Sequence, residues 1–318
     1  MAAFSQPFFI RPCYCKQRLN KEQGGYLSIL NTFKTTILMA LLTGLLIAVG
    51  GSFAGRQGAM IMLVFSLGMN FFSYWYSDKM VLSAYHAQEI SREQAPELYG
   101  LVEKLAQKAE LPMPKVCVIH SATPNAFATG RNPEHAAVAV TTGIMQVLDY
   151  DELGGVLAHE LSHVKHRDTL ISTIAASIAG VISTIAHIAQ WAAIFGGGRS
   201  SSRDDNGGAL GLLFTIIVAP FAAMMIQLAI SRSREYEADK SGGEICGNPL
   251  ALASALEKLD YASSRMRTLE GASTSTAHMC IVNPLKGANV TFSSLFSTHP
   301  STQDRVARLK EQAREMRR

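Results

Sequence analysis

Residues 157–163, Leu-Ala-His-Glu-Leu-Ser-His, combine two histidines and a glutamate in a pattern that can do metal-dependent chemistry. His159 and His163 are four residues apart, so on a helix both imidazoles project from one face and can share a metal ion. Glu160 lies where its carboxylate can take a proton from a water molecule that zinc activates. The pattern predicts one catalytic Zn²⁺ per subunit, with Glu160 as the general base.

A zinc site of this kind needs a third protein ligand and one open position. His166 shares the helical face, but it lies seven residues from His159, about 10 Å along the helix axis. One ion with ligand bonds near 2 Å cannot bind both. Glu235 and Asp239 are four residues apart and share a face, whereas Glu237 points away. One of these two carboxylates can bind the metal while the other hydrogen-bonds the outer nitrogen of a ligating histidine.

The composition is that of a membrane protein with a substantial soluble part. Charged residues make up 17% of the 318 residues, below the usual quarter, and hydrophobic residues make up 48%. The net charge of +4 is spread along the chain without a basic block that contains interleaved aromatic residues, so no nucleic-acid partner is expected. The five cysteines are scattered, as expected for free thiols in a reducing compartment.

Apolar stretches predict about four membrane spans in two helical hairpins. Each stretch is long enough to cross about 30 Å of hydrocarbon. The aromatic cluster at the end of the second is typical of a membrane–water interface. The later pair is interrupted by His187, Gln190 and Pro220, so packing against the soluble part is the alternative there. The stretches are residues 35–51, 58–76, 170–196 and 208–230.

Charge predicts the orientation and the division of the chain. Five basic residues precede the first span and only Arg56 follows it, so the N-terminus is expected in the cytoplasm. Both hairpins then return the chain to that side. The expected parts are an N-terminal cytoplasmic extension, a first hairpin, a first protease half, a second hairpin and a second protease half: residues 1–33, 34–82, 83–169, 170–230 and 231–318.

The polar segments predict an α+β, mainly helical fold. Apolar spacing favours helices over Glu97–Glu110 and Asp149–Asp168, and β-rich runs favour strands at Lys115–His120 and Ala136–Thr141. The last segment is mainly helical, and it ends in an amphipathic helix over residues 301–318.

Four motifs in this order resemble peptidase family M48, and within it the HtpX group of bacterial membrane proteases: His159–His163, Glu235–Asp239, Pro124–Gly130 and Phe296–Pro300. The likeness covers about Lys34 to the C-terminus. It implies a gluzincin-type zinc protease domain with a small β-sheet and two transmembrane hairpins. It assigns His159, His163 and Glu235 as zinc ligands, Glu160 as base and Asp239 as the partner of a ligating histidine.

The resemblance also implies a protease of the bacterial cytoplasmic (inner) membrane with its active site facing the cytoplasm. Its substrates would be misfolded or damaged membrane proteins, and self-cleavage is common in the group. Asn125 and Ala126 would lie in an edge strand that pairs with substrate backbone, although a turn fits the same residues. His299 or Arg305 would stabilise the oxyanion of the reaction, unless the loop before Pro300 only caps a helix.

Three other functions fit parts of the sequence. An intramembrane zinc protease of the site-2 class would carry the two-histidine motif within a span, but residues 149–168 hold too many charges for hydrocarbon. A CAAX-processing protease of family M48 would be larger, with more spans. A transporter with a chance motif would line its path with charges, and the spans here hold few ionisable groups.

Overall fold

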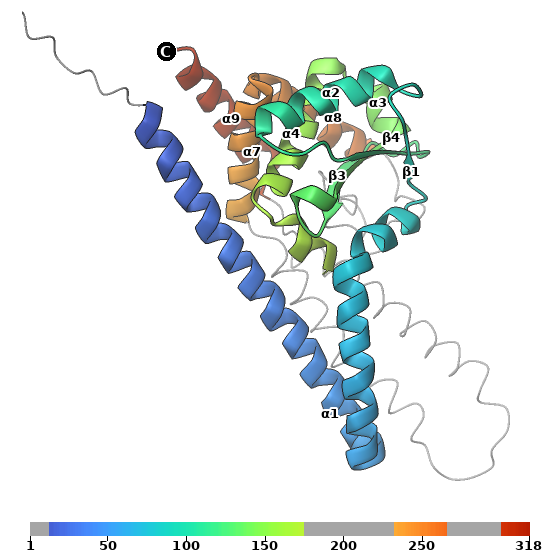
Figure 1. The fold of residues 1–318 in the computed structure, drawn as a ribbon. Helices are drawn as coiled ribbons and strands as arrows, with labels where there is room; N and C mark the ends of the chain where they lie inside the picture. Colours follow the sequence, from blue (N-terminus) through green and yellow to red (C-terminus); the bar gives the residue numbers. More distant parts are fainter. Residues whose placement is uncertain (1–12, 175–231, 266–299) are drawn as a thin grey trace, which may run out of the picture.

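The computed structural model describes residues 13–174, 232–265 and 300–318, which form a globular part and a long helical hairpin (Figure 1). Four strands build one sheet, and helices pack on both of its faces. In chain order the elements are α1 Cys13–Ala84, β1 Gln88–Glu89, α2 Pro96–Ala109, β2 Lys115–Ile119, β3 Ala126–Gly130, η1 Pro133–His135, β4 Ala136–Thr141, α3 Thr142–Val147, α4 Tyr150–Lys165, α7 Arg232–Cys246, α8 Pro249–Arg265 and α9 Thr302–Met316.

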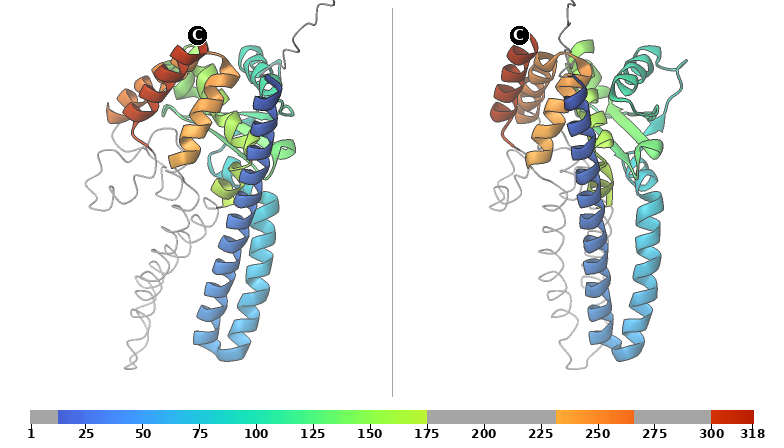
Figure 2. Two further views of the ribbon diagram at one scale, coloured as in Figure 1. Left: turned by 90° about the vertical axis from the view of Figure 1, so that its left-hand side faces the viewer. Right: turned by 60° about the vertical axis from the view of Figure 1, so that its left-hand side comes forward.

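The hairpin is formed by α1, which reverses direction at non-helical Ala54 and Gly55. Its two arms meet at this turn, at the end of the molecule away from the globular part (Figure 2). The Asn70 side-chain amide donates a 2.9 Å hydrogen bond across the hairpin to Thr43 Oγ1. In the described part of the chain, one segment, Ala54–Tyr76, is long and apolar enough to cross a membrane. The helical hairpin of the structure begins at Cys13, inside the expected extension, and both the transmembrane role of this hairpin and the count of four spans stay predictions.

The sheet is small and mixed, with strand order β1-β2-β4-β3. The central pair, β2 and β4, is parallel, with Val116 opposite Val138. The outer strands are antiparallel to their neighbours, so β3 pairs only with β4 among the described strands. This leaves β3 at the edge of the sheet nearest to α4.

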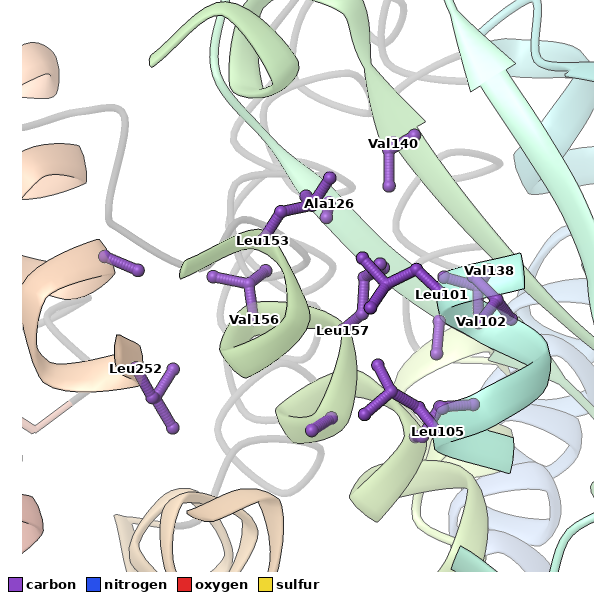
Figure 3. Packing of buried hydrophobic residues seen from close by; sticks show 14 of the residues in the cluster. Leu101, Val102, Leu105, Ala126, Val138, Val140, Leu153, Val156, Leu157 and Leu252 are labelled. Atoms are coloured by element: carbon purple, nitrogen blue, oxygen red, sulfur yellow. The ribbon is translucent and has the colours of Figure 1, made fainter. Parts of the chain in front are cut away.

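The two faces of the sheet enter different cores because side chains alternate along each strand. Val138 and Val140 of β4 face α2 and α4 in the main core (Figure 3). Ala139 and Phe127 face the other way, where the end of α1 covers them. The ring of Phe127 lies 5.1 Å from that of Tyr85, measured between centroids. The hairpin is thus packed directly behind the edge strand β3.

Most of the expected elements are present, and the fold is confirmed as mainly helical with a small mixed sheet. The expected helix over Asp149–Asp168 is wrong at its end, because α4 stops at Lys165 and Arg167 takes a left-handed φ of 56°. The short strand β1 and helix α3 were not predicted. Most of the second hairpin, together with His187, Gln190, Pro220 and His299, lies outside the described residues.

Candidate active site

Helix α4 carries the two-histidine motif through the middle of the globular part. Its first turn is fixed by a capping box, in which Asp149 and Glu152 each accept a hydrogen bond from the other's backbone N–H. Its residues from Glu152 to Ser162 are all buried. The motif therefore lies in a packed protein core.

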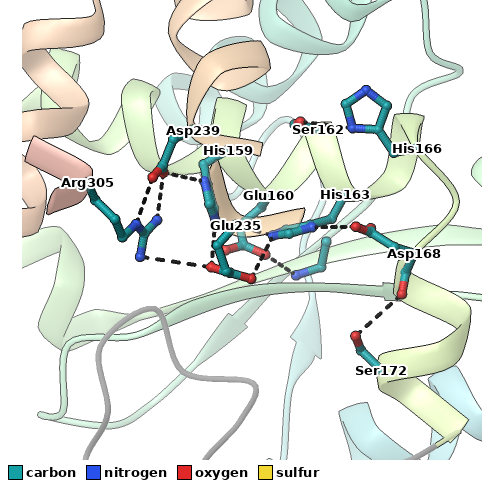
Figure 4. Close-up of polar contacts among 11 residues, drawn as sticks. His159, Glu160, Ser162, His163, His166, Asp168, Ser172, Glu235, Asp239 and Arg305 are labelled. Carbon is teal, nitrogen blue, oxygen red and sulfur yellow. Dashed lines mark hydrogen bonds and ion pairs between the residues drawn. The ribbon is translucent and has the colours of Figure 1, made fainter. Parts of the chain in front are cut away.

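Helix α7 brings the acidic motif onto α4 by very close packing. A Cβ atom at Gly242 would lie 2.9 Å from the backbone N and Cα atoms of His159, so only glycine fits without a shift. This contact sets Glu235 and Asp239 beside the histidines (Figure 4). Glu237 is exposed on the opposite side of α7, as its position in the sequence predicts.

Three ligand atoms converge at one point between α4 and α7. The Nε2 atoms of His159 and His163 are 3.2 Å apart. Each lies 3.8 Å from a carboxylate oxygen of Glu235. A tetrahedral zinc ion with bonds near 2.0–2.1 Å requires ligand atoms about 3.3–3.4 Å apart. The two 3.8 Å distances end on different oxygens of Glu235, and with one ligand atom from each residue the three atoms lie within 4.8 Å of one another. The residues therefore fit a zinc ion once the Glu235 carboxylate moves towards the two histidines.

The outer nitrogens of both histidines face carboxylates. His159 Nδ1 lies 3.0 Å from Asp239 Oδ1, and His163 Nδ1 lies 3.0 Å from Asp168 Oδ2. When both Nδ1 atoms hold their protons towards these carboxylates, both Nε2 atoms present lone pairs to each other and to Glu235. Such a buried cluster of lone pairs requires a cation.

The carboxylates around His163 also raise the pKa of its imidazole, because a bound proton is a cation as well. Burial opposes the charged imidazolium, but Asp168, Glu235 and Glu160 outweigh it and raise the pKa of His163 to about 10. The surroundings of the ligand atoms thus favour positive charge, which supports a metal-binding role for this donor set.

Glu160 lies on the side of the ligand cluster that faces the sheet. Its Oε2 atom accepts a 2.9 Å hydrogen bond from the backbone N–H of Ala128 in β3. Burial raises the pKa of Glu160 above its ordinary value. A carboxylate whose pKa is raised towards neutrality is suited to take up a proton and later release it.

Asp239 is held by Arg305 from the last helix, α9. Arg305 donates two hydrogen bonds to the two carboxylate oxygens, from Nε at 2.8 Å and Nη2 at 2.7 Å. Both side chains are only 3% exposed. Burial works against ionisation of Asp239, but Arg305 lowers its pKa below the ordinary value. Arg305 Nη1 also lies 3.9 Å from Glu235 Oε2, on the side away from His163.

The edge strand β3 presents part of its backbone to the site. The backbone N–H and C=O of Asn125 face β4, where they pair with the Thr141 side-chain oxygen and backbone N–H, both at 2.9 Å. Alternate residues turn their backbone groups the other way, so those of Ala126 and Ala128 face the outer edge. Ala128 N–H is engaged there by Glu160. Of the two expected strand residues, Ala126 is the one whose backbone faces the outer edge of β3.

The chain matches a known peptidase family over most of its length. The model of peptidase family M48 matches residues 92–313, which contain the ligand cluster, Glu160, Asp239 and Arg305. The chain belongs to peptidase family M48. It is thereby a metalloendopeptidase, which excludes the transporter alternative.

The M48 relatives include proteins named "Protease HtpX homolog". The one from Syntrophobacter fumaroxidans is 56% identical over 279 residues, which cover 87% of this chain and 98% of the relative. The one from Thermodesulfovibrio yellowstonii is 56% identical over 285 residues, or 90% and 99% of the two chains. A relative from Thermococcus sibiricus is 53% identical over 284 residues, which cover 89% of this chain and 96% of the relative. The solved structure of Ste24p from S. mikatae aligns with a TM-score of 0.49 at 20% identity, over 89% of this chain and 66% of that one.

Two contacts of the site were missed by sequence reasoning. Asp168 follows the motif helix closely, and only its acidic type after two histidines hinted at a contact. Ala128 carries no side-chain signal at all, because it acts through its backbone. His166, excluded above as a ligand, lies at the end of α4, where its Nδ1 is 3.4 Å from Ser162 Oγ.

Proposed function

We propose that this M48 peptidase is a zinc-dependent endopeptidase of the cytoplasmic membrane that cleaves misfolded or damaged membrane proteins on the cytoplasmic side. The observation that carries the zinc part is the convergence of His159 Nε2, His163 Nε2 and the Glu235 carboxylate within 4.8 Å of one another. Zinc bound there would act as a Lewis acid that polarises the scissile carbonyl and makes water more acidic.

The residues around the ligands transfer protons or hold the ligands in position. Glu160 accepts the proton of the attacking water and transfers it to the nitrogen of the departing amine. Asp239 holds the imidazole of His159 in its ligating orientation, and Arg305 holds Asp239. This geometry supports Arg305 as a positioning residue more than as an oxyanion donor, because two of its donors already bind Asp239.

Substrate would bind as a strand along the outer edge of β3. The backbone of Ala126 faces this edge, and such pairing recognises extended backbone with little dependence on sequence. Unfolded segments offer extended backbone, whereas folded proteins do not. Self-cleavage fits the same mode, since an exposed segment of a second copy can pair in the same way.

The position of β3 supports a substrate close to the membrane. Arg131 follows β3, and its guanidinium carbon lies 4.7 Å from the ring centre of Trp75 near the end of the apolar segment. Trp75 and its aromatic neighbours are exposed, as residues at a membrane interface are. The end of β3 therefore lies close to the end of the apolar segment Ala54–Tyr76.

The zinc mechanism is tested with detergent-purified wild type beside Glu160→Gln, Glu235→Gln and Glu237→Gln. We expect about one zinc per chain and casein cleavage for wild type, with loss of both on chelation and recovery on zinc addition. Glu160→Gln should keep zinc and lose activity by about 10²–10⁴-fold. Glu235→Gln should lose zinc, and exposed Glu237→Gln should match wild type. Cleavage by Glu160→Gln at the wild-type rate would refute the mechanism.

The substrate proposal is tested in vesicles with one unfolded reporter in two forms, one attached to a transmembrane helix and one free. We expect faster cleavage of the attached form at equal bulk concentration. Equal rates would contradict a membrane-protein substrate while leaving the zinc mechanism intact. Protection of a tag at the C-terminus from protease added outside spheroplasts tests the orientation, because α9 lies beside the site.

A further inference from the structure

Asp168 is a buried carboxylate at the site to which the functions above give no role. It is 4% exposed. Its Oδ2 atom is 3.0 Å from His163 Nδ1, the nitrogen that points away from the ligand cluster (Figure 4). The contact mirrors that of Asp239 with His159 on the other side of the site, where the distance is also 3.0 Å. Each histidine of the motif thus has its own carboxylate.

The chain reaches this contact through an unusual turn. Helix α4 ends at Lys165, and Arg167 adopts a left-handed conformation that residues with a side chain rarely take. The turn brings Asp168 back over the last turn of α4, where its backbone N–H donates a 3.2 Å hydrogen bond to the carbonyl of His163. Backbone and side chain of Asp168 therefore both contact the same histidine.

The side chain of Asp168 is not used to cap the next helix. An aspartate just before a helix usually accepts a hydrogen bond from the backbone of the first turn. Residues 169–174 are helical, and the carbonyl of Asp168 accepts the N–H of Ser172. Its Oδ2 atom instead faces His163, and within the described residues its buried Oδ1 atom has no hydrogen-bond partner.

We propose that Asp168 is a positioning residue that holds His163 with its Nδ1 protonated and its Nε2 directed at the metal. The proposal rests on the proposed zinc site. It also connects the metal ligand to the edge strand, because Thr169, the next residue, donates a 3.1 Å hydrogen bond from Oγ1 to the carbonyl of Gly130 at the end of β3. Asp168 and Thr169 together tie His163 and β3 to the start of one helix.

The test compares zinc affinity of wild type and Asp168→Asn by competition with a chromophoric chelator. Asparagine keeps the size of the side chain and begins helices as well as aspartate does, so only the charge changes. We expect zinc binding to weaken about 10–100-fold, with a changed visible spectrum of the cobalt-substituted protein. Asp239→Asn should show a loss of similar size. Asp151→Asn, an exposed position on α4, should bind zinc as wild type does.

The outcomes separate the two proposals. Failure of wild type itself to bind zinc would refute the proposed function. Wild-type binding with Asp168→Asn within twofold of it would overturn only the role of Asp168. So would a lower melting temperature of the zinc-free variant with unchanged zinc affinity, because that describes a purely structural residue. If Asp168→Asn does not fold, imidazole nitrogen NMR shifts of zinc-bound wild type decide: protonated Nδ1 on His163 is expected, and protonated Nε2 would overturn the proposal.

Discussion

The ion pair between Arg305 and Asp239 gives the most sharply defined stability prediction. Both side chains are 3% exposed, and two hydrogen bonds join them. Replacing Arg305 by methionine keeps the length and apolar stem but leaves the Asp239 carboxylate buried without its cation. Removal of one partner from a buried pair costs about 3–5 kcal/mol. For a domain of this size, about 2–4 °C per kcal/mol converts this to a fall in melting temperature of about 6–20 °C.

The assay is thermal unfolding of the zinc-free protein in detergent, so that metal binding does not mask the loss. Lys310→Met is the matched control, because Lys310 lies on the same helix α9 and pairs with Glu257 of α8 at 3.0 Å. The side chains of Lys310 and Glu257 are both about half exposed. Exposed ion pairs contribute about 0–1 kcal/mol to the free energy of unfolding. The double variant Arg305→Met with Asp239→Asn should recover part of the loss, because no buried charge remains unpaired. A melting temperature for Arg305→Met no lower than that of Lys310→Met would refute the reasoning.

Two further predictions concern helix α4. Gly242→Ala should force α7 away from His159 and weaken both zinc affinity and thermal stability. Gly100→Ala is the control: a Cβ atom there meets open space on a helix, so the substitution should stabilise the protein by about 0.5–1 kcal/mol. Equal melting curves for the two variants would contradict the close-packing argument. Burial alone would raise the pKa of Glu152, but Lys258 and two hydrogen bonds lower it below its ordinary value. The stabilisation by the ionised form is therefore complete above the ordinary carboxyl pKa of about 4.3 and is lost as the pH falls through the lowered value. Glu152→Gln should destabilise the protein at pH 7 in denaturant unfolding, with a difference from wild type that shrinks at acid pH; a constant difference would contradict the assignment.

The parts of the site that follow from local spacing could be predicted from the sequence. Residues four apart on a helix share a face whatever the tertiary structure, so the pairing of His159 with His163 and of Glu235 with Asp239 needed no fold. The expected strand over Ala136–Thr141 matches β4, because a run of apolar β-formers in a small domain has few alternatives. These predictions depend on neighbours in the chain.

The parts that were missed depend on contacts between distant segments or on single backbone angles. The end of α4 is set by the left-handed turn at Arg167, which has neither glycine nor proline to mark it. The hydrogen bond from Ala128 to Glu160 needs an edge strand beside α4, and apolar spacing does not show which strand is at an edge. The role of Arg305 as an oxyanion donor stays a prediction, but its buried contact with Asp239 joins segments 66 residues apart and could not be predicted from the sequence.

The contact between α9 and the site has a consequence for the timing of synthesis. The two histidines come first in the chain, Asp239 follows them, and Arg305 follows Asp239 by 66 residues. Because translation runs from the N-terminus, a nascent chain exposes its metal ligands long before it has the arginine that neutralises Asp239. Completion of the site is thus delayed until α9 has been synthesised. A copy that still lacks α9 would therefore hold its metal ligands while its Asp239 carboxylate has no arginine and its proteolytic centre is incomplete.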